Sequence, residues 1–300
     1  EAPFDLVTCL GNTWMEIVDV QEAATLLADL CGRLATGGRI VIDDIPGTLI
    51  PETLLVDQWD IDAAERTIRE HGGEKIAAFI AEPIQGVGGF ATPPDGFFGA
   101  MKKELDNRGV LFISDEVQTG WGRTGENFWG YQAHGMTPDI LTFAKGVANG
   151  LALGGVVASA DLMDSLPGNS LSTFGGNPMS AVGALATIRY MLKHDTQGHA
   201  LAMGARLAGH LQPAVDASPV VAELRGKGLM LAIETVQAGT LEPNTDAARR
   251  IMEEARAAGL LIGKGGLYGN VLRIAPPMTV TEAEIDEAAD VLVRIIGGLG

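Results

Sequence analysis

The chain has 300 residues, a formal net charge of −17 at pH 7, a hydrophobic content of 46% and 40 glycines. This length allows one large or two ordinary domains, and the composition is typical of a soluble α/β protein, with no apolar stretch long enough to cross a bilayer. The acidity argues against a nucleic-acid partner, because phosphate backbones are bound by clustered Lys and Arg.

The two cysteines, Cys9 and Cys31, have neither metal-ligand nor redox spacing. Reduced thiols in a cytoplasmic setting are therefore expected, and no metal site is predicted. No signal peptide is visible, and a chain that starts at Glu1 instead of methionine is expected to be a fragment.

The first 47 residues predict one compact β-α-β unit. A helix at 22–34 lies between strands at 4–12 and 39–44, and Pro46 then breaks the chain. The stretch FDLVTCLGNTW, followed by LATGGRIVIDD, resembles the second half of a class I S-adenosylmethionine methyltransferase. The resemblance implies a short Rossmann-like segment whose cofactor loop lies upstream, so it implies shared ancestry more than methyltransferase activity.

From about Trp59 onward, apolar runs alternate with helical patterns, which predicts a mostly parallel sheet flanked by helices. The predicted strands, each apolar on both faces, are 76–83, 110–114, 140–143 and 154–159. Helices are predicted at 62–72 and 95–109, the second with Gly109 as its C-cap.

A long helix is predicted after the GGNP stretch, with Asn177 as N-cap and Pro178 at its first position. The elements predicted beyond it are helices at 199–212, 245–258 and 281–297 and strands at 220–224, 228–236 and 271–275. This order predicts a large domain at 48–218 and a small C-terminal α+β domain at 219–300.

Two chemically informative residues follow predicted strands. Asp115 ends the run GVLFIS, and Lys145 follows the run ILTF. Ligands of such sheets gather outside the carboxyl ends of the strands, where an amine and a carboxylate together suit pyridoxal phosphate. The Lys145 amine would form a Schiff base with the cofactor aldehyde, and the Asp115 carboxylate would keep the pyridine nitrogen protonated. The alternatives are a solvated lysine and a surface or helix-capping aspartate.

Six motifs then carry a family resemblance: AFIAEPIQGVGGF, LFISDEVQTGWGRTG, DILTFAKGVANG, STFGGNPMS, LRGKGLMLAIE and LRIAPPMT. Their order and spacing over residues 57–297 resemble the class III aminotransferases, which are fold-type I pyridoxal phosphate enzymes. The resemblance implies transfer of an amino group from an amino acid to a 2-oxo acid such as glyoxylate or pyruvate. It also implies a homodimer.

The resemblance assigns roles to further residues. Lys145 would also be the general base at the substrate α-carbon, Val117 would pack on the pyridine ring, and Gln118 would bond near its phenolic oxygen. Thr173 would reach the cofactor phosphate of the partner subunit, with capping of the following helix as the alternative. Glu116 receives no firm role.

Arg273 is the candidate for the substrate carboxylate, because a guanidinium offers a planar fork to a carboxylate. The alternative is a structural ion pair, for example with Glu234. In the 4-aminobutyrate and ornithine branches, a glutamate stands where this chain has Val87. Without that acid Arg273 would stay open, which favours an alanine-glyoxylate or β-amino acid type.

Family members begin with more than a hundred residues that have no recognisable counterpart in residues 1–56. Part of the sheet and half of the phosphate-binding turn are therefore expected to be missing. An inactive fragment or fusion that only pairs with other subunits is the main alternative. Another pyridoxal phosphate reaction, such as that of an aminomutase or a decarboxylase, is the near alternative.

Overall fold

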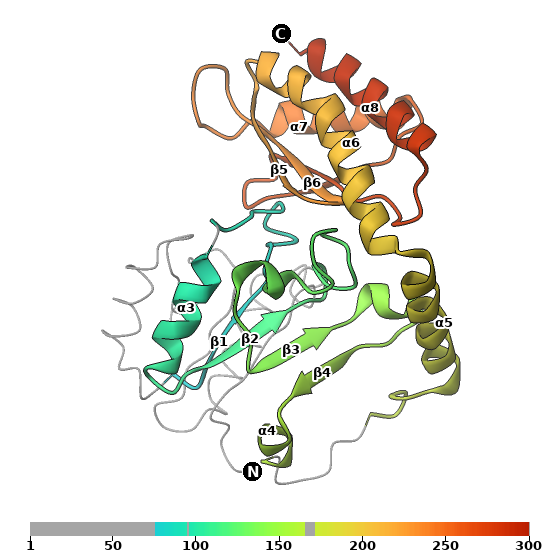
Figure 1. Cartoon of the computed structure of the whole chain (residues 1–300). Coiled ribbons are helices and arrows are strands. Elements are labelled where there is room, and N and C mark those ends of the chain that lie inside the picture. Colours follow the sequence, from blue (N-terminus) through green and yellow to red (C-terminus); the bar gives the residue numbers. More distant parts are fainter. Residues whose placement is uncertain (1–75, 95, 166–171, 300) are drawn as a thin grey trace.

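The computed structural model describes residues 76–94, 96–165 and 172–299, which form two four-stranded sheets (Figure 1). The β-α-β unit predicted at 1–47 and the helix predicted at 62–72 lie outside the described residues. In the view of Figure 1, the first sheet, β1 to β4, lies below the second, β5 to β8.

The first sheet has the strand order β1-β2-β3-β4, and its first three strands are parallel. These strands are β1 (Ala78–Ala81), β2 (Leu111–Asp115) and β3 (Ile140–Phe143), which confirms three of the predicted strands. Helix α3 (Phe97–Asp106) lies between β1 and β2 in the chain, as predicted. It ends at Asp106, so that Gly109 is not its C-cap but lies two residues beyond the C-cap Asn107.

Both faces of these strands are apolar, as the sequence predicted. On one face, Phe112 and Ala81 pack against Phe98, Met101 and Leu105, of which the last three belong to α3. On the other face lies a second cluster, formed by Ala78, Ile80 and Ile113. Because side chains alternate along a strand, a run with no polar position fills both layers at once.

The fourth strand, β4 (Gly155–Ala158), differs from the prediction. It runs antiparallel to β3, and Val156 and Val157 are exposed. Only the short 3₁₀ helix η4 (Lys145–Ala148) lies between β3 and β4. A parallel return needs a crossover of a dozen or more residues, so this short connection reverses the chain direction.

After β4 come the short helix α4 (Ala160–Asp164) and two long helices, α5 (Pro178–His194) and α6 (Thr196–Ala217). The predicted start of α5 is confirmed, since the Asn177 side chain accepts a hydrogen bond from the amide of Ser180 at 2.9 Å. Such a cap satisfies one of the free amides of the first turn.

The second sheet is antiparallel, with the order β5-β6-β8-β7. Its strands are β5 (Val221–Lys227), β6 (Met230–Thr235), β7 (Gly263–Gly265) and β8 (Val271–Ile274). Its helices are α7 (Thr245–Ala257) and α8 (Glu282–Gly297). All but β7 were predicted; three residues that include two glycines give no strand signal.

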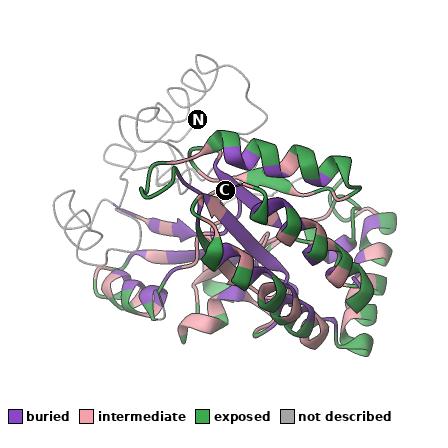
Figure 2. Cartoon of the chain, turned by 90° about the horizontal axis from the view of Figure 1, so that it is seen from above, coloured by how far each residue is buried: buried purple, intermediate pink, exposed green. Residues whose placement is uncertain are grey.

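Helix α6 packs with α7 and α8 over this second sheet, in a core that includes Leu207, Ile233, Ile251, Leu272 and Leu292. Figure 2 shows the buried strands beneath exposed helix faces. The domain boundary at 219 stays a prediction, and α6 lies on the N-terminal side of it. Among the described helices, none combines the length and apolar character that a membrane crossing requires.

Candidate active site

The carboxyl ends of β1, β2 and β3 meet at one edge of the first sheet, because the three strands are parallel. Glu82 follows β1, Asp115 ends β2, and Lys145 lies two residues after β3. The charges of Glu82 and Asp115 both act on the pKa of Lys145, so the three side chains lie close together. The sequence predicted from strand order that Asp115 and Lys145 would lie at this edge, and Glu82 lies there with them.

Lys145 opens η4 with a backbone φ of 44°, which is rare for a residue other than glycine. Lys145 lines a cavity and is exposed as a residue. Its amine is nevertheless partly desolvated by neighbouring atoms, and this desolvation lowers its pKa. The Glu82 and Asp115 carboxylates oppose this lowering of the pKa, and the Arg273 guanidinium adds to it. The amine therefore loses its proton more readily than a free lysine does.

Asp115 is buried at the end of β2, where its carboxylate accepts a hydrogen bond from the Val117 amide at 3.0 Å. Burial raises the pKa of Asp115, and the Val117 amide and the Lys145 charge oppose this. A neighbouring cation, here the Lys145 amine, removes part of the cost of keeping this carboxylate ionised. The alternative of a surface or helix-capping aspartate is thus wrong, and the expected burial of Asp115 is what the structure has.

The cavity has a volume of about 190 Å³ and lies between the two sheets. From the first-sheet side it is lined by Val117, Gln118, Gly120, Trp121, Arg123, Lys145, Gly146 and Met191. The loop after β1 and the second sheet contribute Phe90, Met230, Ala275 and Met278. Of the residues that the sequence singled out, Lys145, Val117 and Gln118 therefore face one shared space.

Gly86, in the loop after β1, joins three of the candidate residues. Its amide donates to a Glu82 carboxylate oxygen at 3.1 Å, and its carbonyl accepts from the Arg273 Nη1 at 3.0 Å. A Cβ atom at this position would lie 1.8 Å from the Gln118 Nε2. Any side chain here would therefore displace Gln118 from the cavity wall.

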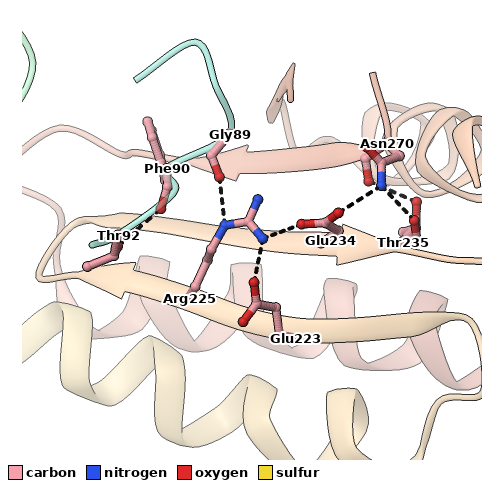
Figure 3. Close-up of polar contacts among 8 residues, drawn as sticks. All are labelled: Gly89, Phe90, Thr92, Glu223, Arg225, Glu234, Thr235 and Asn270. Atoms are coloured by element: carbon pink, nitrogen blue, oxygen red, sulfur yellow. Dashed lines mark hydrogen bonds and ion pairs between the residues drawn. The ribbon is translucent and has the colours of Figure 1, made fainter. Parts of the chain in front are cut away.

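Arg273 lies on β8, and its guanidinium carbon is 5.6 Å from the centre of the Phe90 ring. Its cross-strand neighbours, Ala232 and Gly263, are small and leave room for the guanidinium. The expected alternative, an ion pair with Glu234, is wrong: Glu234 pairs with Arg225, as Figure 3 shows. Arg273 instead extends toward Gly86 and the charge of Lys145.

Arg225 connects the second sheet to the same loop that carries Gly86. Its Nε donates to the Gly89 carbonyl at 3.0 Å, and its Nη1 contacts both Glu223 and Glu234 (Figure 3). Asn270 donates to the other Glu234 oxygen at 3.2 Å. The loop at 86–90 is therefore held in place by two arginines from the second sheet.

The residues that line the cavity do not include Asp115, Arg273 or Glu82, and Val87 and Thr173 also lie outside the lining. The Val87 carbonyl accepts a hydrogen bond from the Gly266 amide at 2.9 Å, which holds the loop against the segment after β7. Thr173 is exposed, and because Asn177 caps α5, the alternative of a capping Thr173 is wrong. The structure brings Thr173 to none of the other candidates.

Glu116 is a residue whose role sequence reasoning missed. It is fully buried and accepts hydrogen bonds from the Ser114 and Thr119 hydroxyls, at 3.2 and 2.6 Å. It also accepts from the Gly130 and Tyr131 amides, both at 2.7 Å. Glu116 therefore closes the loop 116–131, which carries Val117, Gln118, Trp121 and Arg123 along the cavity. A glutamate after a buried strand was the only available signal.

Trp121 was also missed. Its φ is 65°, and its ring packs against Phe128, Trp129 and Phe143. The indole Nε1 is buried and has no hydrogen-bond partner within the described part of the chain, although Trp121 lines the cavity. A buried indole donor usually finds an acceptor, so this one suits a ligand with acceptor atoms.

Comparison with known proteins identifies the family. Residues 50–296 match the family described as aminotransferase class-III. The chain belongs to this family. It is 42% identical over 213 residues to alanine-glyoxylate aminotransferase 2 homolog 2 of Arabidopsis thaliana, covering 70% of this chain and 44% of that protein. It is 37% identical over 230 residues to the 4-aminobutyrate aminotransferase of Mycobacterium leprae, covering 76% of this chain and 51% of that protein.

The fold agrees with the family. The solved ornithine aminotransferase of Toxoplasma gondii, described with partial occupancy of pyridoxal phosphate at its active site, superposes with a TM-score of 0.74 at 29% identity. That match covers 84% of this chain and 58% of the solved one. The predicted fold-type I transferase fold is thus confirmed, and pyridoxal 5′-phosphate is the cofactor of the family. The chain spans about half the length of these curated relatives.

Proposed function

We propose that this chain belongs to an enzyme that moves an amino group from an amino acid to a 2-oxo acid such as glyoxylate or pyruvate, with pyridoxal phosphate as cofactor. The observation that carries the proposal is the Lys145 amine, which faces a cavity between the two sheets with a lowered pKa beside Glu82 and Asp115. An amine that loses its proton readily is the nucleophile that an aldehyde cofactor requires.

The residues around the cavity suit this cofactor. Lys145 would hold its aldehyde carbon, Asp115 its ring nitrogen, Val117 one ring face, and Gln118 the region near its phenolic oxygen. The Trp121 Nε1, which has no partner in the described residues, would donate to an acceptor atom of the bound group. When bound, pyridoxal phosphate draws electrons from the substrate α-carbon.

Lys145 would then act as the general base that moves the α-proton of the substrate. A base is most effective when its pKa lies near the working pH. Desolvation lowers the pKa of Lys145 toward that pH. Arg273, whose charge helps to lower that pKa, makes a second positive charge on the amine less favourable.

Arg273 would bind the substrate carboxylate. The Gly86 carbonyl and the Phe90 ring orient its guanidinium, and residue 87 is a valine that offers no competing carboxylate. A planar guanidinium held from one side can still present a fork to a carboxylate. Together with the 42% identity to the alanine-glyoxylate relative, this supports the alanine-glyoxylate or β-amino acid type over a 4-aminobutyrate type.

A second copy of the chain is the proposed partner, with Thr173 reaching the cofactor phosphate of the other subunit. Its support is the apolar face of α5, where Met179, Val182 and Leu185 are 73%, 66% and 47% exposed, beside Phe174 at 84%. Contiguous exposed apolar residues are typical of an interface. The cytoplasmic setting and the methyltransferase-like ancestry of residues 1–47 stay predictions from the sequence.

If α5 forms the dimer interface, a charge introduced on its apolar face should weaken the dimer. Replacing Val182 with aspartate should convert a dimer into a monomer, because a carboxylate in a closed apolar interface loses its hydration. Sedimentation equilibrium measures the mass. Leu241→Asp, at a position that is 88% exposed and outside α5, should leave the mass unchanged. A wild-type chain that sediments as a monomer at all concentrations would contradict the pairing.

The activity is tested by capture of the cofactor. The chain is incubated with pyridoxal phosphate, reduced with borohydride, digested, and the modified lysine is identified by mass spectrometry. We expect the label on Lys145, and we expect pyruvate or glyoxylate to restore the initial cofactor spectrum after an amino acid has changed it. No label would favour the non-catalytic remnant, and label without restoration would favour an aminomutase or decarboxylase.

A further inference from the structure

Arg123 reaches from the first sheet into the second. It lies in the loop after β2, and its Nη1 donates to the Leu229 carbonyl at 3.3 Å and to the Pro276 carbonyl at 2.6 Å. Its own carbonyl accepts from the Leu229 amide at 3.1 Å. Leu229 directly precedes β6, and Pro276 lies two residues after β8. Because β6 and β8 are antiparallel neighbours, one side chain binds the start of β6 and the end of β8 at the same edge of the second sheet.

The two acceptor carbonyls adjoin residues that line the cavity. Met230 follows Leu229, and Ala275 precedes Pro276. Pro276 is also only three positions after Arg273 in the chain. The bond from Arg123 to the Pro276 carbonyl therefore ties the end of β8 to the loop after β2. The bond from Arg273 to the Gly86 carbonyl ties β8 to the loop after β1.

The charge of Arg123 has no acidic partner within the described residues. Its pKa is lowered by burial, with no carboxylate acting against this. A guanidinium stays protonated in proteins, so this is a partly buried cation solvated by backbone carbonyls. Burying this cation costs free energy, and the two hydrogen bonds from its Nη1 to the Leu229 and Pro276 carbonyls hold these two segments at a fixed distance from each other.

The backbone around Arg123 leaves little freedom. Gly228, in the turn before β6, has a φ of 53°, and a Cβ there would lie 2.5 Å from the carbonyl carbon of Thr124. Beside this contact, Lys227 and Glu126 form an ion pair at 2.8 Å. The loop after β2 and the β5–β6 turn are thus in direct backbone contact.

We propose that Arg123 is a positioning residue, which holds β8 and its Arg273 at a fixed place over the cavity that contains Lys145. It acts through the backbone of Leu229 and Pro276 and does not itself need to touch the substrate. The inference rests on the proposed function only for what the cavity binds; the mechanical role stands on the contacts alone.

Hydrogen exchange in the intact chain tests this role. In Arg123→Met, peptides covering 228–232 and 271–280 should exchange on the order of tenfold faster or more, because a hydrogen bond from a charged donor is lost at each end. Peptides covering β1 to β3 should exchange as in the wild type, which reports that the first sheet remains folded. Arg123→Lys keeps the charge without the fork and should lie between the two.

The matched control is Arg206→Met. Arg206 joins α6 to α8 through two bonds to Asp286, at 2.6 and 2.7 Å, so it also bridges elements of the second unit but lies away from the cavity. It should not change exchange at 271–280. Wild-type exchange at 271–280 in both Arg123 variants, or an equal increase in Arg206→Met, would overturn the inference.

A binding measurement separates this inference from the proposed function. Calorimetric titration with pyruvate should give an affinity lowered about tenfold or more in Arg123→Met relative to the wild type, and an unchanged affinity would count against the positioning of Arg273. Loss of capture in the wild type would overturn the proposed function alone, because the exchange result does not depend on the cofactor.

Discussion

Replacing Lys145 with alanine should abolish covalent capture of pyridoxal phosphate and reduce any transfer of amino groups by a factor of at least about 100 to 10,000. The factor is the usual contribution of a positioned general base, and the variant also loses the nucleophile. Mass spectrometry after borohydride reduction measures the capture. The control is Lys193→Ala, at an exposed position near the end of α5, which should leave the label on Lys145.

The role of Lys145 can also be tested by the pH dependence of its reaction with pyridoxal phosphate. Desolvation lowers the pKa of Lys145, so its amine loses the proton at a lower pH than the amine of a free lysine does. The capture rate should therefore reach half its maximum below the pKa of about 10.4 of an unperturbed lysine side chain. N-acetyl-lysine amide in the same solution provides the reference. Equal midpoints for Lys145 and the reference amine would contradict this account of the site.

The part of the site that the sequence predicted is the part that strand order dictates. Asp115 and Lys145 follow apolar runs, and parallel strands bring their carboxyl ends to one edge. Val117 and Gln118 follow Asp115 by two and three positions, so they lie on the same loop. Arg273 lies on β8, between β6 and β7 in the second sheet, and its charge acts on the pKa of Lys145 although it does not line the cavity.

The part that the sequence did not predict depends on contacts between segments far apart in the chain. The direction of β4 follows from a short connection, because the apolar run itself has no direction. The partners of Arg123 lie 106 and 153 positions away, and both are backbone carbonyls, which have no sequence signature. An ion pair of Glu234 with Arg273 was the alternative to substrate binding, and register instead places Arg225 within reach of Glu234.

The cavity is thus built by two kinds of restraint. Arginines of the second sheet, Arg225 and Arg273, donate to carbonyls of the loop after β1, and Arg123 donates in the opposite direction. The loop 116–131 needs a restraint of its own, because it carries four of the cavity-lining side chains named above and contains no helix beyond the short η3 (Gly130–His134). Glu116 supplies that restraint.

Replacing Glu116 with alanine should lower the free energy of unfolding by about 4 kcal/mol or more, since two hydroxyls and the amides of Gly130 and Tyr131 lose their acceptor, and each buried donor left without one costs about 1 to 3 kcal/mol. Glu116→Gln keeps one acceptor oxygen and should lose less. Urea denaturation measures both. Glu253→Ala removes an exposed ion pair with Arg256 and should stay within about 1 kcal/mol of the wild type.

The titration of Glu116 should contribute to the pH dependence of the free energy of unfolding. Burial raises its pKa in the folded chain, and the four donors oppose this without reversing it. Between the pKa of an unfolded glutamate, about 4.3, and the raised pKa, the folded chain binds more protons than the unfolded one, so stability falls as the pH rises. Glu116→Gln cannot titrate and should lose this part of the slope. If its slope equals that of the wild type, Glu116 is not the titrating group; if its stability also equals that of the wild type, the four hydrogen bonds do not hold the loop.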